Sequence, residues 1–473
     1  MTPLVDVPIA VLDPARFSGT VSAPLYDDFQ HAAEQARKLL AGRVVWNINT
    51  TAHGGGVAEM LRSLLGYVRG AGIDARWEVI TGDSEFFRVT KRIHNNLHGS
   101  AGDGGELGGA ERAVYNAVLD TNADALRACV RANDVVIVHD PQTAGLIPAI
   151  RDIGARVIWR CHVGTDTPND LVRRAWAFLL PDVVQADAVI FSHSAFAWKG
   201  IDEARIHIVA PSIDAFSPKN YELDADTVQL ILGAARIVDG GRQGTPSFVR
   251  QDGSAARIDS RARIIDDVPI PSGVPVVTQV SRWDRLKDPV GVLQGFVDHV
   301  APRHPTSHLA LAGPDVAAVS DDPEGAEVLA EVTESRRGLA EAMRDRVHLL
   351  CLPMDDDEVN AVMVNALQRH ATVAVQKSLA EGFGLTVAEA MWKGRPVVAS
   401  RVGGIQDQIV DGVSGLLLDD PTDLRAFGDA VSELLDDPRR AAAMGDSARE
   451  QVRELFLGPR HLIQYVDLLN TLP

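Results

Sequence analysis

The sequence predicts an α/β protein of two domains in tandem, each built on a parallel, doubly wound sheet. Three observations predict it: the length of 473 residues, an alternation of short β-branched runs with helical patterns, and a break in that alternation near Pro218. A single hydrophobic core stops growing near about 250–300 residues, so a chain of this length is expected to divide. Repeated βα units make successive strands parallel.

The first alternating series predicts a Rossmann-like domain over residues 1–218. Apolar residues at helical spacing, such as Val57, Leu61 and Leu65, follow its first strand. Its expected strands are residues 43–49, 77–81, 134–140, 156–162, 187–193 and 206–210.

The second series predicts a similar domain over residues 273–454. Its expected strands are 274–280, 308–312, 347–352, 372–376, 395–400 and 415–418, with helices such as 290–300 and 356–369. The irregular residues 219–272 are interpreted as a connection with an insertion, and residues 455–473 as a segment that crosses back to the first domain. Ligands of such sheets bind beyond the carboxyl ends of the strands, so a cleft between two facing domains is the expected site.

Composition excludes several classes of protein. Lys and Arg total 46 against 64 Asp and Glu, and the formal net charge of −18 argues against a nucleic-acid binder. The three cysteines are far apart and show no CxxC spacing, which disfavours a disulfide framework or a zinc site. With no secretory signal and no apolar run near about 18 residues, we expect a cytoplasmic protein that does not bind membranes. The oligomeric state stays open, a homodimer included.

The most specific motif lies between two glutamates. A strand ends at Gln376, a glycine-containing loop follows, and a helix is expected from about Leu385. The free N–H groups at Gly384, Leu385 and Thr386 are suited to phosphate oxygens. Glu381 before the helix and Glu389 within it can accept hydrogen bonds from sugar and ribose hydroxyls. Taken alone, Glu381 is better explained as a helix-capping acid and Glu389 as a solvated helix residue; the functional interpretation depends on the whole arrangement.

Two cations form a second motif. Arg282 and Lys287 follow the first strand of the second series, where they can neutralise a diphosphate leaving group in an otherwise acidic protein. Arg285 is a weaker candidate. The alternative is an ordinary charged loop.

The first series offers a glycine run and four polar side chains near strand ends. Gly55 and Gly56, with Gly54 before them, open the first helix and allow close approach of a phosphate or sugar; a plain tight turn is the alternative. Candidate sugar ligands are His162, Asp140, Gln142 and Asn49, whose alternative is a structural or loop-capping role.

Together these motifs resemble a known family. The Glu381–Glu389 spacing is similar to the E-x7-E signature of the retaining glycosyltransferases of family four, which have the GT-B fold of two Rossmann-like domains. Arg282 and Lys287 resemble its Arg-x4-Lys pair, and His162 resembles the histidine that lies near the transferred sugar. The stretches 139–142, 159–162, 280–284 and 376–378 resemble the trehalose synthases (glycosyltransferring) within it, and the resemblance covers about residues 43–415.

This resemblance implies a retaining hexosyltransferase that moves glucose from a nucleoside-diphosphate-glucose to glucose, forming trehalose. It implies that Arg282, Lys287 and the amides of residues 384–386 hold the diphosphate, and that Glu389 holds the ribose. Glu381, His162 and Asp140 are expected to orient the sugars. No metal or other cofactor is required, and stimulation by Mg²⁺ stays open. The expected partners are a nucleotide sugar and a small sugar acceptor.

Four alternatives remain at this point. A trehalose phosphorylase uses nearly the same site, and another family-four enzyme uses a different acceptor. A non-catalytic nucleotide-sugar-binding protein is disfavoured by the intact set of charged residues. An oxidoreductase is disfavoured because no G-x-G-x-x-G follows the first strand. A departure from the family at Leu379-Ala380, where a basic residue is expected, leaves the donor base and the acceptor open.

Overall fold

The chain divides into two units, each with its own sheet. The computed structural model describes residues 4–52, 55–240, 244, 246–316 and 323–472. Unit 1 comprises Met1–Ser212 and Phe456–Pro473, and unit 2 comprises Ile213–Leu455. The division therefore falls six residues before the boundary that the sequence predicts at 218.

Unit 1 contains a sheet of seven strands in the order β1-β3-β2-β4-β5-β6-β7. All neighbours pair in parallel except β1, which runs antiparallel to β3. The strands are β1 (Leu4–Asp6), β2 (Val45–Asn49), β3 (Ala75–Ile80), β4 (Val135–His139), β5 (Arg156–Cys161), β6 (Ala188–Phe191) and β7 (Ile206–Ile208). The six predicted parallel strands are confirmed, whereas the short edge strand β1 was not predicted.

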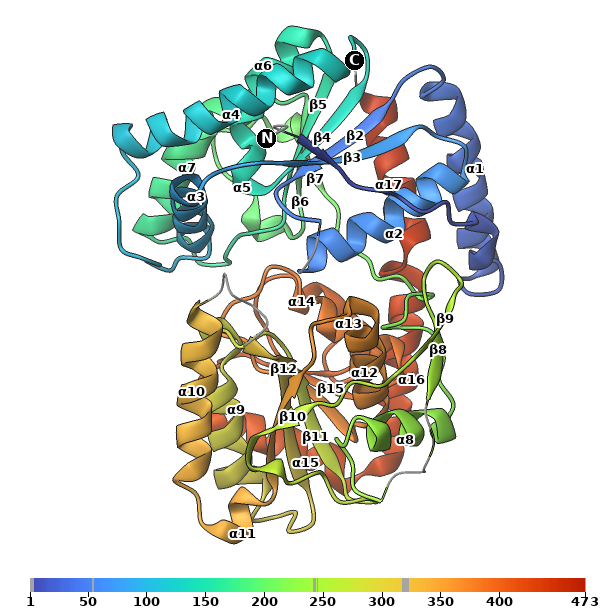
Figure 1. Cartoon of the computed structure of the whole chain (residues 1–473), viewed down its shortest axis with the longest axis vertical. Helices are drawn as coiled ribbons and strands as arrows, with labels where there is room; N and C mark the ends of the chain where they lie inside the picture. Colours follow the sequence, from blue (N-terminus) through green and yellow to red (C-terminus); the bar gives the residue numbers. More distant parts are fainter. Residues whose placement is uncertain (1–3, 53–54, 241–243, 245, 317–322, 473) are drawn as a thin grey trace. The chain divides into compact units, whose positions relative to one another are not determined.

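Helices cover both faces of this sheet (Figure 1). They are α1 (Ala23–Leu39), α2 (Gly56–Gly70), α3 (Ser84–Leu97), α4 (Gly109–Cys129), α5 (Asp140–Thr143), α6 (Ile147–Ile153), α7 (Asp170–Val183) and α17 (Gly458–Thr471). Helix α17 packs against α1, and its residues Val466, Leu468 and Leu469 are buried in the core between these helices and one face of the sheet (Figure 1). Helix α17, the last helix of the chain, thus belongs to the unit that residues 1–212 form.

Unit 2 contains a second seven-stranded sheet in the order β10-β13-β12-β11-β14-β15-β16. Here too one edge strand, β10, is antiparallel, and the other neighbours pair in parallel. The strands are β10 (Arg263–Ile264), β11 (Val276–Val280), β12 (His308–Pro314), β13 (Val347–Leu352), β14 (Val373–Gln376), β15 (Val397–Ser400) and β16 (Leu416–Leu418). All six strands predicted for the second domain are confirmed.

The helices of unit 2 alternate with these strands. They are α8 (Ala225–Ala234), α9 (Pro289–Gly295), α10 (Pro323–Arg337), α11 (Glu341–Arg344), α12 (Asp357–His370), α13 (Leu385–Trp392), α14 (Ile405–Gln408), α15 (Leu424–Asp436) and α16 (Pro438–Leu455). The helix predicted over 290–300 is α9, which continues as a π-helix over Phe296–Val300.

The stretch 219–272 is not a separate connection, because it packs into unit 2. Helix α8 buries Val228, Ile231 and Leu232 against α12, and β10 joins the edge of the sheet. Between α8 and β10 in the sequence, β8 (Ser247–Val249) and β9 (Ala255–Arg257) form a two-stranded hairpin. The strands of this segment are short and its arginines are scattered, so it shows no hydrophobic period from which its elements could be predicted.

Each sheet has one point where the order of the parallel strands reverses. In unit 1 the chain goes from β2 outward to β3 and then returns to β4 on the other side of β2. In unit 2 it goes from β11 to β12 and β13 and then returns to β14 beside β11. Ligands of open α/β sheets bind at such switch points, beyond the carboxyl ends of the strands.

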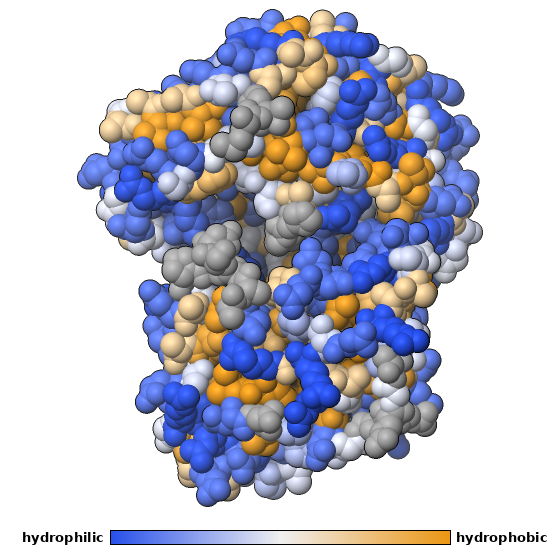
Figure 2. All heavy atoms as spheres, viewed as in Figure 1, coloured by the Kyte–Doolittle hydropathy of each residue, from blue (hydrophilic) through white to orange (hydrophobic). Residues whose placement is uncertain are grey.

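In the view of Figure 2, hydrophilic side chains cover most of the surface of each unit, with smaller hydrophobic patches among them. Within the described ranges, no helix combines the length and the apolar character that crossing a membrane requires.

Candidate functional site

The predicted phosphate-binding turn lies at the switch point of unit 2. After β14 ends at Gln376, the chain loops to Gly384, the residue that precedes α13, whose backbone φ is 84°. A Cβ at Gly384 would stand 3.0 Å from the Ile405 side chain and 3.3 Å from that of Glu381. Both the left-handed conformation and the crowding therefore require glycine. No side chain caps this helix start, so its leading N–H groups are available to an anion.

Glu381 and Lys287 form an ion pair beside this turn. The Glu381 carboxylate also accepts hydrogen bonds from Ser378 Oγ (3.4 Å) and from its neighbour's backbone, Gly382 N (3.2 Å). The two side chains are only 12% and 15% exposed. Glu381 is therefore not a cap of α13, and two residues predicted from separate motifs are in contact.

Lys287 is presented by a short 3-10 helix, Arg285–Lys287, which Asp284 caps through the N–H of Leu286 at 2.8 Å. Gln279, on the neighbouring β11, donates to the carbonyl of Lys287 at 2.9 Å. The loop after β11 is thus held at both ends, which fixes the cation against the switch point.

The other two cations of this loop behave differently. Arg282 is more than half exposed and pairs with Asp284 at 3.2 Å, so its guanidinium remains accessible to solvent. Arg285 is bound by Glu331 (2.7 Å) and Glu327 (3.3 Å) of α10.

Glu389 lies in the second turn of α13 and is 2% exposed. Its carboxylate pairs with Lys219 at 3.6 Å. The alternative of a solvated helix residue is therefore wrong. Its predicted role at a ribose stays a prediction.

Two further polar residues shape the loop, and the sequence motifs assign no specific role to either of them. Lys377 is fully buried, pairs with Asp288 and donates to the carbonyl of Pro421 at 2.6 Å. Gln376 accepts from Thr386 Oγ1 at 3.1 Å and so ties the strand end to the start of α13. The sequence shows a lysine directly after a strand, but it does not show that this lysine is buried.

In unit 1, the glycine run opens α2. Gly55 has a φ of 88° and precedes the helix, which no side chain caps. A Cβ at Gly55 would meet no atom within 4 Å, so its conformation rather than crowding requires glycine. Gly56 is the first helical residue, and Gly54 lies outside the described residues.

Asp140 and His162 come together at the ends of β4 and β5. Asp140 has a φ of 63° and accepts a hydrogen bond from the backbone N–H of His162 at 2.8 Å. Its own carbonyl accepts from Trp159 Nε1 at 3.0 Å. Burial raises the pKa of Asp140 to about 6, although the hydrogen bond and the charge of Arg160 oppose the shift.

The protonation of His162 follows from its neighbours. Arg160 Nε lies 3.2 Å from His162 Nε2, and a guanidinium can only donate, so Nε2 is the acceptor and Nδ1 carries the proton. Burial, Arg160 and His139 hold the pKa of His162 well below its usual value. His162 is thus a neutral imidazole whose Nδ1–H can donate to a ligand.

A buried network behind His162 was missed in the sequence. His139 stacks on His162 with ring centres 5.6 Å apart, and its Nε2 lies 3.0 Å from Asn47 Oδ1. Arg160, fully buried, donates to Tyr465 Oη on α17 at 2.8 Å and to the carbonyl of Val209 at 3.1 Å.

The two remaining predicted sugar ligands differ. Asn49 accepts from Trp77 Nε1 at 2.9 Å and donates to the carbonyl of Thr51 at 2.8 Å, so both ends of its amide have protein partners. Its geometry favours the structural alternative. Gln142 is half-buried, and its side chain has no hydrogen bond to any other residue that the structure describes.

Within the described ranges, no group of three or more His, Cys, Asp or Glu side chains is arranged to hold a metal ion. The cluster in unit 2 consists of the cations Arg282 and Lys287, the carboxylates Glu381 and Glu389, and the start of α13. The cluster in unit 1 consists of the neutral His162 and Asp140.

Comparisons with known proteins match segments of both units. Residues 47–198 match the family described as "Trehalose synthase, N-terminal domain", and residues 260–451 match "Glycosyl transferases group 1". A trehalose synthase from Pyrococcus horikoshii is 35% identical over 439 residues, which cover 93% of this chain and 92% of the relative. The chain belongs to the trehalose synthase family. A trehalose synthase from Rubrobacter xylanophilus is also 35% identical, covering 95% of this chain and 94% of the relative.

More distant similarities place this trehalose synthase family member in a wider group. A trehalose phosphorylase from Pleurotus sajor-caju is 28% identical, covering 78% of this chain but 50% of that relative. An α,α-trehalose-phosphate synthase (UDP-forming) from Burkholderia vietnamiensis superposes with a TM-score of 0.66 at 16% identity, covering 91% of this chain and 99% of that one. A sucrose-phosphate synthase from Thermosynechococcus elongatus has a TM-score of 0.62 at 19% identity, with the same coverage. The fold is GT-B, as predicted, and the protein is a glycosyltransferase related to trehalose metabolism.

Proposed function

We propose that this protein transfers glucose from a nucleoside-diphosphate-glucose to free glucose and forms trehalose with retention of anomeric configuration. The observation that carries the proposal is the Lys287–Glu381 ion pair beside the uncapped start of α13, in a chain of the trehalose synthase family. One cation, one carboxylate and a row of free N–H groups fit a donor that joins a diphosphate to a sugar.

Unit 2 would hold the donor. Lys287, Arg282 and the amides of residues 384–386 would bind the diphosphate, whose charge grows as the bond to the sugar breaks. Lys287 would then exchange the Glu381 carboxylate for phosphate oxygens. Glu381, released from its lysine, would accept hydrogen bonds from the sugar hydroxyls, and Glu389 from the ribose.

Unit 1 would orient the sugars. His162 would donate its Nδ1–H to a sugar oxygen, while Asp140 would accept from a hydroxyl. In a front-face reaction, the acceptor oxygen forms its bond to the anomeric carbon on the face from which the diphosphate leaves. The acceptor's proton passes to the leaving phosphate oxygen, so no protein nucleophile is needed. Positioning and charge stabilisation are then the main contributions of the protein.

The donor base, the requirement for metal and the cellular location belong to the proposal. Two cations and a helix start can neutralise a diphosphate, so we propose that the reaction proceeds without a metal ion and that Mg²⁺ at most stimulates it. We also propose a cytoplasmic location, where nucleotide sugars are made.

A trehalose phosphorylase is the second candidate, because a phosphorylase is among the relatives. Inorganic phosphate would then occupy the place of the donor's diphosphate. The same cations would bind it, so the geometry of unit 2 alone does not distinguish the two reactions.

The deciding experiment incubates the purified protein with ADP-, UDP- and GDP-glucose and with glucose as acceptor. We expect release of the nucleoside diphosphate together with a disaccharide whose NMR spectrum shows two equivalent α-anomeric protons. A parallel incubation with trehalose and phosphate tests the alternative. Glucose 1-phosphate release there, without transfer from any nucleotide donor, would replace the proposed function by phosphorolysis.

A further inference from the structure

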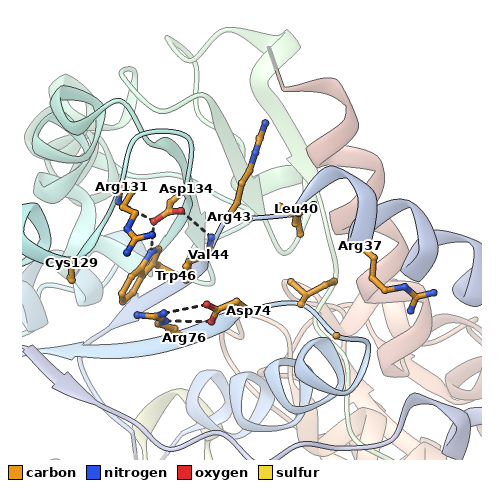
Figure 3. Close-up of a pocket in the computed structure, with 14 residues that line it drawn as sticks. Arg37, Leu40, Arg43, Val44, Trp46, Asp74, Arg76, Cys129, Arg131 and Asp134 are labelled. Carbon is orange, nitrogen blue, oxygen red and sulfur yellow. Dashed lines mark hydrogen bonds and ion pairs between the residues drawn. The ribbon is translucent and has the colours of Figure 1, made fainter.

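Two charged side chains are buried at the amino ends of strands, where they hold neighbouring segments together. Asp134, directly before β4, accepts a hydrogen bond from Trp46 Nε1 at 3.1 Å beside a cavity of unit 1 (Figure 3). In unit 2, Arg336 is buried, pairs with Asp266 and donates to the carbonyl of Val347, the first residue of β13, at 2.6 Å. Both side chains are at the strand ends opposite to those that carry the candidate site.

Lys377 is a buried charge at the carboxyl ends of the strands of unit 2. It directly follows β14, is fully buried, pairs with Asp288 and donates to the carbonyl of Pro421 at 2.6 Å. Pro421 follows β16, and Asp288 follows the 3-10 helix that presents Lys287. One ammonium therefore joins the segments that follow β11, β14 and β16.

The stability of the fold alone is a weak reason for this ion pair. Taking an ammonium out of water is costly, and a well-packed apolar pair often stabilises a fold as well as a buried ion pair does. A buried pair is better explained where it selects one arrangement of the segments that carry it. The pair of Lys377 with Asp288 selects the arrangement of the residue next to Lys287.

The conformation of Asp288 places its carboxylate between α9 and Lys377. Its backbone, with φ 48° and ψ 51°, is in the left-handed region that residues other than glycine rarely adopt. Its Oδ1 caps α9 by accepting from Gly291 N at 3.0 Å, and its Oδ2 pairs with Lys377. A Cβ at Gly291 would clash with Oδ2, so the glycine leaves room for the oxygen that Lys377 binds.

Two further links join the segment after β14 to the backbone around Lys287. The N–H of Leu379 donates to the carbonyl of Leu286 at 2.8 Å. The buried Gln279 accepts from Lys377 N at 3.3 Å and donates to the carbonyl of Lys287 at 2.9 Å. The backbone that carries the Lys287 side chain is therefore held on both sides by the segment that also carries Glu381.

These links do not use the Glu381 carboxylate, so they persist when a donor replaces that carboxylate at Lys287. We propose that Lys377 is a positioning residue for Lys287: by holding Asp288, it keeps the backbone of Lys287 in place while the ammonium exchanges Glu381 for the diphosphate. This role rests on the proposed function, in which Lys287 binds the diphosphate. Without Lys377, the ammonium of Lys287 would meet the leaving diphosphate in a less favourable geometry, and transfer would be slower.

Two variants separate positioning from stability. Lys377→Met leaves the Asp288 carboxylate without its cation, so it should lower both the thermal unfolding midpoint and kcat. In Lys377→Met/Asp288→Asn the unpaired charge is also removed, and an asparagine side chain can still cap α9 and tolerate the left-handed conformation. The double variant should recover most of the midpoint, whereas its kcat should stay about 10- to 100-fold below that of the wild type, with KM for glucose unchanged.

Arg336→Met is the matched control for the loss of a buried cation. Arg336, like Lys377, has one carboxylate and one carbonyl partner, but it lies at the opposite end of the strands of the same sheet. Arg336→Met should therefore lower the thermal unfolding midpoint and leave kcat unchanged.

Hydrogen exchange gives a readout that does not depend on the reaction. The backbone N–H of Lys287 donates to the carbonyl of Asp284 at 3.0 Å, within the 3-10 helix. The peptide that covers residues 282–290 should exchange faster in the double variant than in the wild type, because the helix has lost its attachment to Lys377. Its exchange should be unchanged in Arg336→Met.

The proposed function and the role of Lys377 can fail separately. If the wild type transfers no glucose from any nucleotide donor, the proposed function fails, whereas the exchange of the 282–290 peptide still tests Lys377. If the wild type catalyses phosphorolysis instead, the same variants are compared in that reaction. Positioning by Lys377 is overturned if the double variant keeps the kcat of the wild type, if its peptide exchanges as in the wild type, or if Arg336→Met loses as much kcat.

Discussion

Replacing Lys287 by alanine tests the role of unit 2 in the proposed transfer. Lys287 is the less exposed of the two candidate cations, and its ammonium is already held against Glu381. The change removes one positive charge from the proposed diphosphate site and leaves the Glu381 carboxylate without its lysine. The remaining negative charge would repel the donor that the wild type attracts.

The size of the effect follows from the burial of this pair. Two unit charges about 4 Å apart interact by about 1 kcal/mol in water and about 4 kcal/mol at an effective dielectric constant near 20. With Lys287 only 15% exposed, the second figure is nearer. Part of it is offset because the wild type must give up the Glu381 contact when phosphate binds. We therefore expect kcat/KM to fall by about 10²- to 10³-fold, since about 1.4 kcal/mol is a factor of ten.

The assay measures initial rates of nucleoside diphosphate release from the preferred donor at saturating glucose. Arg285→Gln is the matched control, because Arg285 stands two residues away in the same 3-10 helix but is bound to Glu327 and Glu331. Its rate should stay within about threefold of the wild type, by the small energies of exposed ion pairs. A folded Lys287→Ala protein with a rate as high as this control would refute the proposed role of the lysine.

Three further predictions concern single residues. Burial raises the pKa of Asp140 to about 6, so the native state binds the proton more tightly than the unfolded state, and the free energy of unfolding should fall by about 1–3 kcal/mol as pH rises from 4 to 6. Urea titrations of Asp140→Asn should lack this fall. If the free energies of unfolding of the wild type and the variant change equally with pH, the burial argument is contradicted. Arg160→Gln removes a charge that lowers the pKa of His162. The kcat of this variant should therefore begin to fall on the acid side at a higher pH than the kcat of the wild type. Identical pH profiles would rule out this electrostatic coupling. Gly384→Ala forces a left-handed alanine into a crowded turn and should lower the free energy of unfolding by about 1–2 kcal/mol, whereas Gly109→Ala, with open space around it, should be neutral in the same denaturation experiment.

The sequence predicted both sheets because buried parallel strands are continuous apolar runs between helical patterns. It missed β1 and β10, which are antiparallel edge strands of three and two residues, too short to show any period. It also missed that the segment before β10 packs into unit 2, since α8 contributes only a few apolar residues to that core.

The candidate site was predictable where its residues are close in the chain. Glu381 and the turn at Gly384 lie within one loop, whereas the ion pair between Glu381 and Lys287, which are 94 positions apart, is seen only in the folded unit. The support for His162 was not predictable in the same way. Arg160 and Tyr465 are 305 positions apart, and only the folded unit shows that they are hydrogen-bonded. Burial, as for Lys377, is likewise a property of the fold.

The assignment of α17 to unit 1 bears on how the chain is made. Unit 2 occupies one uninterrupted stretch of sequence, whereas unit 1 requires residues from both ends of it. During synthesis from the N-terminus, every residue of unit 2 is added before Phe456, whereas unit 1 lacks α17 until later. Until Tyr465 emerges, Arg160 has no hydroxyl to bind, and the apolar face of α1 that α17 covers stays open. A protein truncated before α17 should therefore expose this face of α1 and leave Arg160 without the Tyr465 hydroxyl.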